Sequence, residues 1–126
     1  MEETKDNLKP IILVAEDTES NFLLASAILR ENYRLEWAHN GIEAIDMYQK
    51  FHPAAILMDI HMPDMDGLVA TTKIREIDKK IPIIAVTAYA FDSDKRNALA
   101  AGCNSFITKP ISIVELKDKL KEALSE

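Results

Sequence analysis

Short apolar runs alternate with longer amphipathic stretches along most of this chain. Most of the runs are continuously apolar, a pattern typical of strands that are covered on both faces of a sheet. Residues 34–38 instead alternate between apolar and polar positions, as an outer strand does. The predicted strands are residues 11–15, 34–38, 54–59, 82–87 and 104–108.

The amphipathic stretches between these runs predict helices. Their apolar residues recur at three-to-four spacing, and residues that favour helix ends stand at their borders. The predicted helices are residues 18–32, 40–51, 68–77, 92–101 and 112–124. The expected caps are Thr18, the capping boxes of Asn40 with Glu43 and Ser112 with Glu115, and Gly102 at a helix C-terminus.

Apolar stripes run along three of the predicted helices, and that of the second helix is expected to face the sheet. Along the chain they are Phe22, Leu23, Leu24, Ala27, Ile28 and Leu29, then Ile42, Ile45, Met47 and Tyr48, and finally Ile113, Leu116, Leu120 and Leu124.

Strands that alternate with helices over this length predict a parallel sheet with helices on both faces, because right-handed crossovers are strongly favoured. The expected fold class is a doubly wound α/β domain of residues 10–126. Residues 1–9 are expected to form a flexible N-terminal arm or linker. In such sheets ligands bind beyond the carboxyl ends of the strands, near the point where the strand order reverses.

Composition and charge exclude several classes of function. The chain has 126 residues, of which 15 are basic and 21 acidic, and the net charge of -6 repels a phosphate backbone, so direct nucleic-acid binding is not expected. No apolar stretch approaches the roughly 18 to 20 residues that span a bilayer, and the acidic start is unlike a signal peptide. We therefore expect a soluble, cytoplasmic domain without membrane contact. Cys103, the only cysteine, is expected to be a small buried residue.

Polar residues with matching chemistry follow four of the predicted strands. Glu16 and Asp17 follow the first, Asp59 ends the third, Thr87 ends the fourth and Lys109 follows the fifth. The carboxyl ends of parallel strands share one edge, so these side chains should converge. Three converging carboxylates repel one another unless their pKa values rise or a divalent cation neutralises them. Oxygen ligands without histidine or cysteine favour Mg²⁺.

A metal at this edge would draw a phosphoryl donor to the Asp59 carboxylate, which can attack phosphorus in line and become an acyl phosphate. Thr87 can then hydrogen-bond one transferred oxygen, and Lys109 supplies positive charge to another and pairs with Asp59 before modification. The bond before Pro110 is a candidate cis peptide that would aim the lysine into the cleft. The plainer alternative is that Glu16 and Asp17 only complement the positive end of the following helix.

Together these residues carry a resemblance to a known family. The acidic pair Glu16-Asp17, the run from Met58 through Asp59 to Gly67, the pair Thr87-Ala88 and the pair Lys109-Pro110 stand in order at the expected strand ends. With these motifs the chain resembles the receiver domains of two-component response regulators, from about residue 10 to residue 124.

The resemblance implies a flavodoxin-like fold of five βα units with strand order 2-1-3-4-5. It implies that Asp59 accepts a phosphoryl group from the phosphohistidine of a histidine kinase or a histidine phosphotransfer protein. The implied cofactor is Mg²⁺, with Asp17 and Asp59 as direct ligands, Glu16 acting through water, and the backbone carbonyl of His61 as a further ligand. A glutamate in place of the family's commoner first aspartate still suits a group that reaches the metal through water.

The resemblance also implies a conformational switch. Thr87 and Lys109 would hold the phosphoryl oxygens, and Phe106 stands where the family's switch aromatic, often tyrosine, swings inward. Because Phe106 lacks a hydroxyl, it can report the switch by packing but not by a hydrogen bond. The residues expected to modulate the site are His61, Ala88, Tyr89 and Pro110.

Other interpretations stay open at this point. The motifs look most like receivers attached to hybrid sensor histidine kinases, and the alternative is a free-standing single-domain regulator. In either case we expect a self-phosphorylating and self-dephosphorylating switch, not a turnover enzyme. A weak dimer through the fourth helix, fifth strand and fifth helix is a further hypothesis.

The main competing function is an aspartate-nucleophile phosphatase of the haloacid dehalogenase type. That class expects a second aspartate two residues after the nucleophile, where this chain has His61, and a cap domain for which there is no room. A nucleotide-binding domain is disfavoured because the chain lacks both G-x-G-x-x-G and a P-loop.

Overall fold

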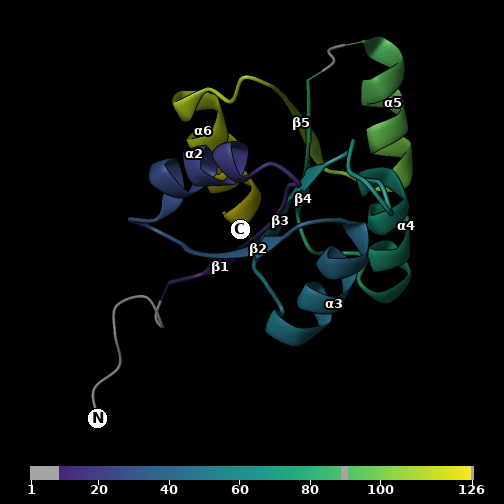
Figure 1. Ribbon diagram of the computed structural model, residues 1–126, viewed down its shortest axis with the longest axis horizontal. Helices are drawn as coiled ribbons and strands as arrows, with labels where there is room; N and C mark the ends of the chain where they lie inside the picture. The colour runs from purple at the N-terminus through teal and green to yellow at the C-terminus, as the bar shows by residue number, and fades with distance from the viewer. Residues whose placement is uncertain (1–8, 89–90, 126) are drawn as a thin grey trace.

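A five-stranded parallel sheet forms the centre of the protein (Figure 1). The computed structural model describes residues 9–88 and 91–125. The strands are β1 (Ile11–Ala15), β2 (Arg34–Ala38), β3 (Ala55–Asp59), β4 (Ile83–Thr87) and β5 (Ser105–Thr108). Their order across the sheet is β2-β1-β3-β4-β5, which confirms the predicted topology, and β2 is an edge strand as predicted.

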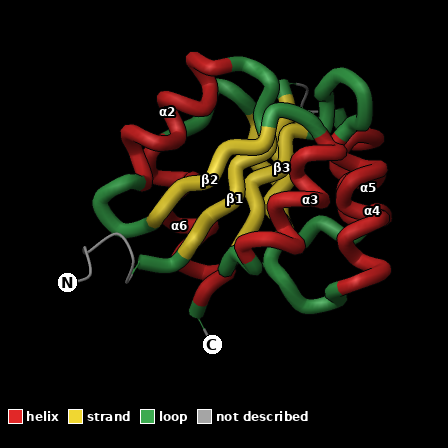
Figure 2. The backbone as a smooth tube through the Cα atoms, turned by 60° about the horizontal axis from the view of Figure 1, so that its bottom comes forward, coloured by secondary structure: helices red, strands yellow, loops and turns green. Residues whose placement is uncertain are grey.

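Helices cover both faces of this sheet, as Figure 2 shows. They are α2 (Glu19–Leu29), α3 (Gly41–Phe51), α4 (Gly67–Ile77), α5 (Asp92–Ala101) and α6 (Ile113–Leu124). The pair α2 and α6 lies on one face, and α3, α4 and α5 lie on the other. The doubly wound, flavodoxin-like α/β class is therefore confirmed.

Two apolar cores hold the layers together, one on each face of the sheet. Along β1, Leu13 and Ala15 face α3, α4 and α5, whereas Ile12 and Val14 face α2 and α6. Every residue of β3 and β4 is buried, which explains their continuous apolar sequences. Each fully buried leucine or isoleucine contributes about 1.5–3 kcal/mol. Cys103 is buried as predicted, and burial raises the pKa of its thiol.

The first helix begins and ends differently from the prediction. Thr18 is the N-cap residue, but its side chain makes no capping hydrogen bond; its backbone N–H donates to Glu16 Oε2 at 3.2 Å. The helix stops at Leu29 instead of residue 32, because the N–H groups of Asn32 and Tyr33 both turn back to the carbonyl of Leu29.

The two predicted capping boxes are confirmed on their N-cap side. Asn40 Oδ1 accepts the Glu43 N–H at 2.9 Å, and Ser112 Oγ accepts the Glu115 N–H at 3.3 Å. The Glu43 carboxylate does not return to its own N-cap residue; it accepts the N–H of His39 at 2.9 Å. Gly102 ends α5 with φ 116°, a left-handed conformation that favours glycine.

Several residues of the predicted apolar stripes lie on the surface. A continuous apolar stretch is wider than the strip of helix that contacts the sheet, and small residues such as Ala25 and Ala44 fill the close contacts instead. The exposed stripe residues are Leu23, Leu24, Ala27, Ile42 and Ile113. Of these, Ile42 was predicted to face the sheet, and that prediction is wrong.

The predicted arm of residues 1–9 lies outside the described residues except for Lys9, whose ammonium donates to the carbonyl of Arg30 at 3.0 Å. Within the described part of the chain, no helix has the length and apolar character needed to cross a membrane.

Gly67 allows the start of α4 to pack directly against the end of β3. A methyl group on Gly67 would overlap the carbonyl oxygen of Asp59 and lie 2.8 Å from Ile60 Cα. We therefore expect Gly67→Ala to lower the free energy of unfolding by about 1–3 kcal/mol, measured by urea denaturation. Val69→Ala, on an exposed position of the same helix, is the control and should change it by less than about 0.5 kcal/mol. Equal stability of the two variants would contradict this packing argument.

Candidate functional site

The carboxyl ends of four strands bring the predicted site residues to one edge of the sheet. Glu16 directly follows β1, Asp59 is the last residue of β3, Thr87 is the last residue of β4, and Lys109 directly follows β5. The Lys109 ammonium lies 2.9 Å from Asp59 Oδ2 and 3.1 Å from Glu16 Oε1. One cation from the fifth strand therefore joins carboxylates from the first and third.

Asp17 completes an acidic cluster at this edge. One carboxylate oxygen from each of Glu16, Asp17 and Asp59 lies within 4.8 Å of the others. Glu16 and Asp59 are only 4% and 3% exposed, whereas Asp17 is exposed. The cluster is thus buried at its base and open at Asp17, which leaves a route by which a small ion can enter.

Burial and mutual charge shape the protonation of this cluster. Burial raises the pKa of Glu16, and the nearby charge of Asp59 raises it further, against the opposing effect of Lys109. Burial alone would lower the pKa of Lys109, but its hydrogen bonds and charge interactions with Asp59 and Glu16 outweigh this effect, so the pKa rises. The lysine is therefore held firmly in its charged form.

The donor set of the cluster fits a divalent, oxygen-loving cation. Three carboxylates and one ammonium leave a formal charge of minus two when all are ionised. The three acidic residues offer only oxygen atoms, which suit Mg²⁺ better than the transition metals that prefer nitrogen or sulfur. Such an acidic cluster is typical of the Mg²⁺ site of receiver domains.

Backbone hydrogen bonds fix the loops that carry the central residues. Asp59 Oδ1 accepts the N–H of His61 at 3.0 Å, so both oxygens of this carboxylate are engaged. The Lys109 N–H donates to the carbonyl of Thr87 at 2.7 Å, which ties the lysine to the neighbouring strand end. The peptide bond between Lys109 and Pro110 is cis, as the sequence had suggested.

The remaining predicted residues surround this centre. Thr87 is fully buried at the end of β4, and the next residue, Ala88, is exposed. His61, two residues after Asp59, is also exposed. Phe106, on β5, is half-buried, and the Lys95 ammonium lies 5.5 Å from the centre of its ring. Tyr89 lies outside the described residues.

Sequence reasoning missed a tryptophan that contacts the acidic pair. The indole Nε1 of Trp37 donates a hydrogen bond of 2.7 Å to the backbone carbonyl of Glu16, and Asn21 Nδ2 lies 3.4 Å from Glu16 Oε2. Trp37 lies near the end of β2, which pairs with β1 just before Glu16. This position next to the acidic pair was the one signal in the sequence that pointed to Trp37.

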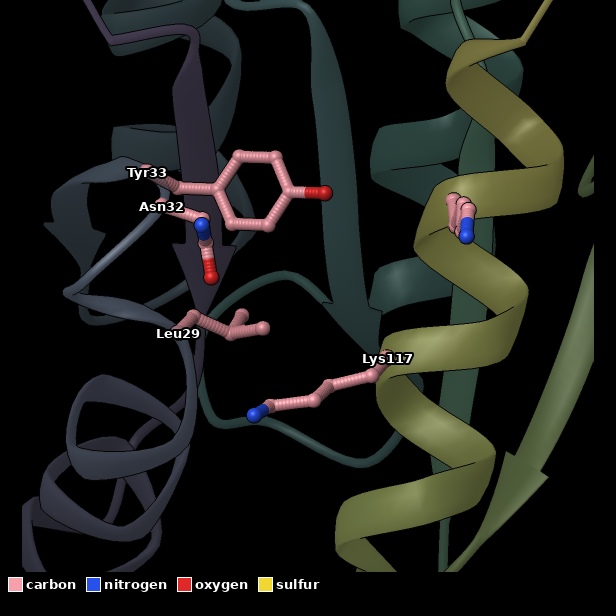
Figure 3. A pocket seen from close by; sticks show the side chains of 5 residues that line it. Leu29, Asn32, Tyr33 and Lys117 are labelled. Atoms are coloured by element: carbon pink, nitrogen blue, oxygen red, sulfur yellow. The ribbon is translucent and has the colours of Figure 1, made fainter.

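A hollow on the described surface lies away from this cluster. A cavity of about 430 Å³ opens between the C-terminal end of α2 and helix α6, and Figure 3 shows Leu29, Asn32 and Tyr33 on one side with Lys117 reaching across. Tyr33 directly precedes β2, so this cavity lies toward the opposite edge of the sheet from Asp59. It takes no part in the site.

The raised pKa of Glu16 predicts a specific pH dependence of stability. The folded protein binds the Glu16 proton more tightly than the unfolded chain does. In the unfolded chain the pKa of a glutamate is about 4.3. The resulting stabilisation is complete below that value and is lost as the pH rises through the higher folded pKa. In EDTA, the stability of the wild type relative to Glu16→Gln, measured by urea denaturation, should therefore fall as the pH rises above the value at which a free glutamate titrates. A difference that stays constant or grows would contradict the raised pKa.

Comparisons with known proteins agree with this geometry. A family model described as the response regulator receiver domain matches residues 12–121. The polar-differentiation response regulator DivK of Brucella anthropi is 35% identical over 118 residues, which make up 91% of this chain and 96% of that protein.

Two solved structures are similar in both fold and sequence. The receiver domain of a sensor histidine kinase from Pseudomonas aeruginosa, described with a magnesium ion coordinated in its active site cleft, has a TM-score of 0.87 and 36% identity, covering 94% of this chain and 99% of that one. A chain in the co-crystal structure of the Saccharomyces cerevisiae phosphotransfer protein Ypd1 with the receiver domain of Ssk1 has a TM-score of 0.85 and 31% identity, covering 90% and 88%.

The strand-end cluster and these similarities converge on one family. The family model spans most of the chain, and the relative from Brucella anthropi matches across nearly its whole length. This chain therefore belongs to the response regulator receiver domains, the phosphoryl-accepting switches of two-component signalling.

Proposed function

We propose that Asp59 is the phosphoacceptor of this receiver domain and that its donor is the phosphohistidine of a histidine kinase or a histidine phosphotransfer protein. The observation that carries this proposal is the joint contact of Lys109 with Asp59 and Glu16 beside the exposed Asp17. It combines a nucleophilic carboxylate, a fixed positive charge and an acidic metal cluster in one place.

The residues act on the reaction in distinct ways. An oxygen of Asp59 attacks phosphorus as the phosphorus–nitrogen bond of the donor breaks, and the leaving imidazole nitrogen takes the bonding electrons. Lys109 lies close enough to Asp59 to neutralise a phosphoryl oxygen attached to it, and Thr87 supplies a hydroxyl for another. Because both groups are anchored on strand ends, little reorganisation is needed during transfer.

The proposed cofactor is Mg²⁺. Asp17 and Asp59 are its direct ligands, Glu16 reaches it through water, and the backbone carbonyl of His61 completes the protein ligands. When bound, the ion offsets negative charge on the carboxylates and on the incoming phosphoryl group. The oxygen-only cluster and the magnesium ion described in the similar Pseudomonas aeruginosa receiver support this assignment.

We propose that phosphorylation is read out through Thr87 and Phe106. Thr87 is buried one residue before the exposed Ala88, and Phe106 is paired in register with Ala85 on the neighbouring strand. A shift of Thr87 toward the phosphoryl group would change the space available to the Phe106 ring, which only packs and donates no hydrogen bond. His61, Ala88, Tyr89 and Pro110 remain the proposed modulators of phosphate lifetime.

An apolar patch on α2 suits a protein donor. Leu23 and Leu24 are 55% and 42% exposed on the helix that begins just after the acidic pair. A histidine phosphotransfer partner that buries these side chains could bring its phosphohistidine close to Asp59. The similarity to the receiver crystallised with Ypd1 supports a partner of this class.

The finer identity of the parent protein also belongs to this proposal. Similarity to the Pseudomonas aeruginosa kinase receiver supports a receiver attached to a hybrid histidine kinase, whereas similarity to DivK supports a stand-alone regulator. We propose a cytoplasmic location in either case. In either setting residues 10–126 would be the receiver, with residues 1–9 as an arm or linker. A weak dimer through α5, β5 and α6 has support from exposed Leu99 and Val114.

Asp59 is expected to be the single site of phosphorylation by a small donor. With Mg²⁺ and acetyl phosphate, the intact mass should rise by one phosphoryl group, and Asp59→Asn should abolish this increase because the amide is not a nucleophile. Asp64→Asn, an exposed carboxylate in the following loop, is the matched control and should be modified like wild type. Modification that persists in Asp59→Asn, or steady hydrolysis of many phosphate esters as by a phosphatase, would refute the proposal.

The α2 patch is expected to serve the protein donor but not the small one. Leu23→Glu with Leu24→Glu should slow phosphotransfer from a cognate phosphotransfer protein by tenfold or more, by placing charge in an apolar contact, roughly 1.4 kcal/mol or above. Labelling by acetyl phosphate should stay within about twofold of wild type. Ile77→Glu at the end of α4, equally exposed at 55%, is the control and should transfer normally. If the control also loses phosphotransfer, or if the double variant transfers as fast as wild type, this patch is not the docking surface.

A further inference from the structure

The edge strand β2 holds Glu16 by both of its backbone groups. The Glu16 N–H donates to the carbonyl of Ala38 at 2.9 Å, which extends the ladder between β1 and β2 by one residue. The Glu16 carbonyl accepts the Trp37 indole N–H at 2.7 Å. The second bond comes from a side chain, so it depends on the identity of one residue.

The indole itself packs against two other rings. Phe22 of α2 stacks on Trp37 with ring centres 4.5 Å apart and planes 3° from parallel, and His39 lies 4.1 Å away at 32°. His39 Nδ1 lies 2.8 Å from Glu43 Oε1 at the start of α3. Offset aromatic pairs of this kind resist rotation of the rings, so the indole N–H keeps one direction.

We propose that Trp37 is a positioning residue for the metal-binding acidic pair. The carbonyl that it holds belongs to the peptide unit joining Glu16 to Asp17, and a planar peptide that is fixed at its oxygen also fixes the direction of the next residue. Asp17 is exposed, so the direction of its carboxylate depends mainly on this backbone. The inference rests on the proposed Mg²⁺-dependent phosphorylation of Asp59.

Loss of the indole N–H would leave the Glu16 carbonyl to bind water, which permits the peptide unit to rotate. Asp17 would then sample several directions, and ion binding would have to select the competent one. The penalty should fall on Mg²⁺ affinity, because a saturating ion restores the bound arrangement. A loss of general packing would instead reduce the amount of folded protein at every Mg²⁺ concentration.

The chain offers a clean test because Trp37 is its only tryptophan. Biosynthetic replacement of tryptophan by benzothienylalanine changes this site alone, keeping ring size and stacking while removing the N–H. We expect the dissociation constant for Mg²⁺, measured by calorimetry, to increase about fivefold to tenfold. The rate of labelling by acetyl phosphate at saturating Mg²⁺ should stay within about twofold of that of the unsubstituted protein. Trp37→Phe, made by ordinary mutagenesis, should show the same separation.

Tyr48→Phe is the matched control. This substitution also removes one aromatic hydrogen-bond donor, the hydroxyl that donates to Asp78 Oδ2 at 2.8 Å. That hydrogen bond lies far from the acidic pair, so the variant should bind Mg²⁺ as wild type does. Unchanged Mg²⁺ affinity in the benzothienylalanine protein, or an equal loss in Tyr48→Phe, would overturn the role of Trp37. Failure of the unsubstituted protein to bind Mg²⁺ would instead refute the proposed function on which the inference rests.

Discussion

The Lys109 ammonium, shared between the Asp59 and Glu16 carboxylates, is the interaction on which the rest of the site depends. Two buried carboxylates at adjacent strand ends would destabilise the fold if they were unpaired, because removing an ion from water without a partner costs several kcal/mol. The lysine compensates part of this charge and leaves the remainder for a cation. A site that is only partly neutralised in its resting state is therefore prepared for both a metal and a phosphoryl group.

Sheet topology explains why these groups meet. In the sheet, β2 and β3 lie on opposite sides of β1, so the direction in which strands are added reverses between β1 and β3. Glu16, Asp17 and Asp59 lie at the carboxyl ends of these two strands. The register then places Thr87 beside the end of β5, which leads into Lys109. The two apolar cores fix these ends in space, so residues far apart in sequence act as one rigid constellation.

The strands, the topology and the acidic site could be predicted because each depends on a pattern that the sequence displays directly. Continuous apolar runs give β3 and β4, and the carboxyl ends of parallel strands must share an edge. The sequence could not show which apolar helix residues face the sheet. Leu23 and Ile42 are exposed because each belongs to an apolar stripe that is wider than the strip of helix in contact with the sheet. The bond from Trp37 to Glu16 was also hidden, because it joins a side chain to a backbone group across two strands and follows no motif.

Asp59, the acidic pair and Lys109 are proposed to form a single Mg²⁺-dependent phosphoacceptor site. A crystal structure of the protein with Mg²⁺ and beryllofluoride, which mimics a phosphoryl group, tests all parts of this site together. We expect beryllium bonded to Asp59, Mg²⁺ coordinated by Asp17 and Asp59, and the Lys109 ammonium and Thr87 hydroxyl directed at fluorine atoms. Beryllofluoride on another residue, or an adduct on Asp59 without a metal beside Asp17, would contradict it.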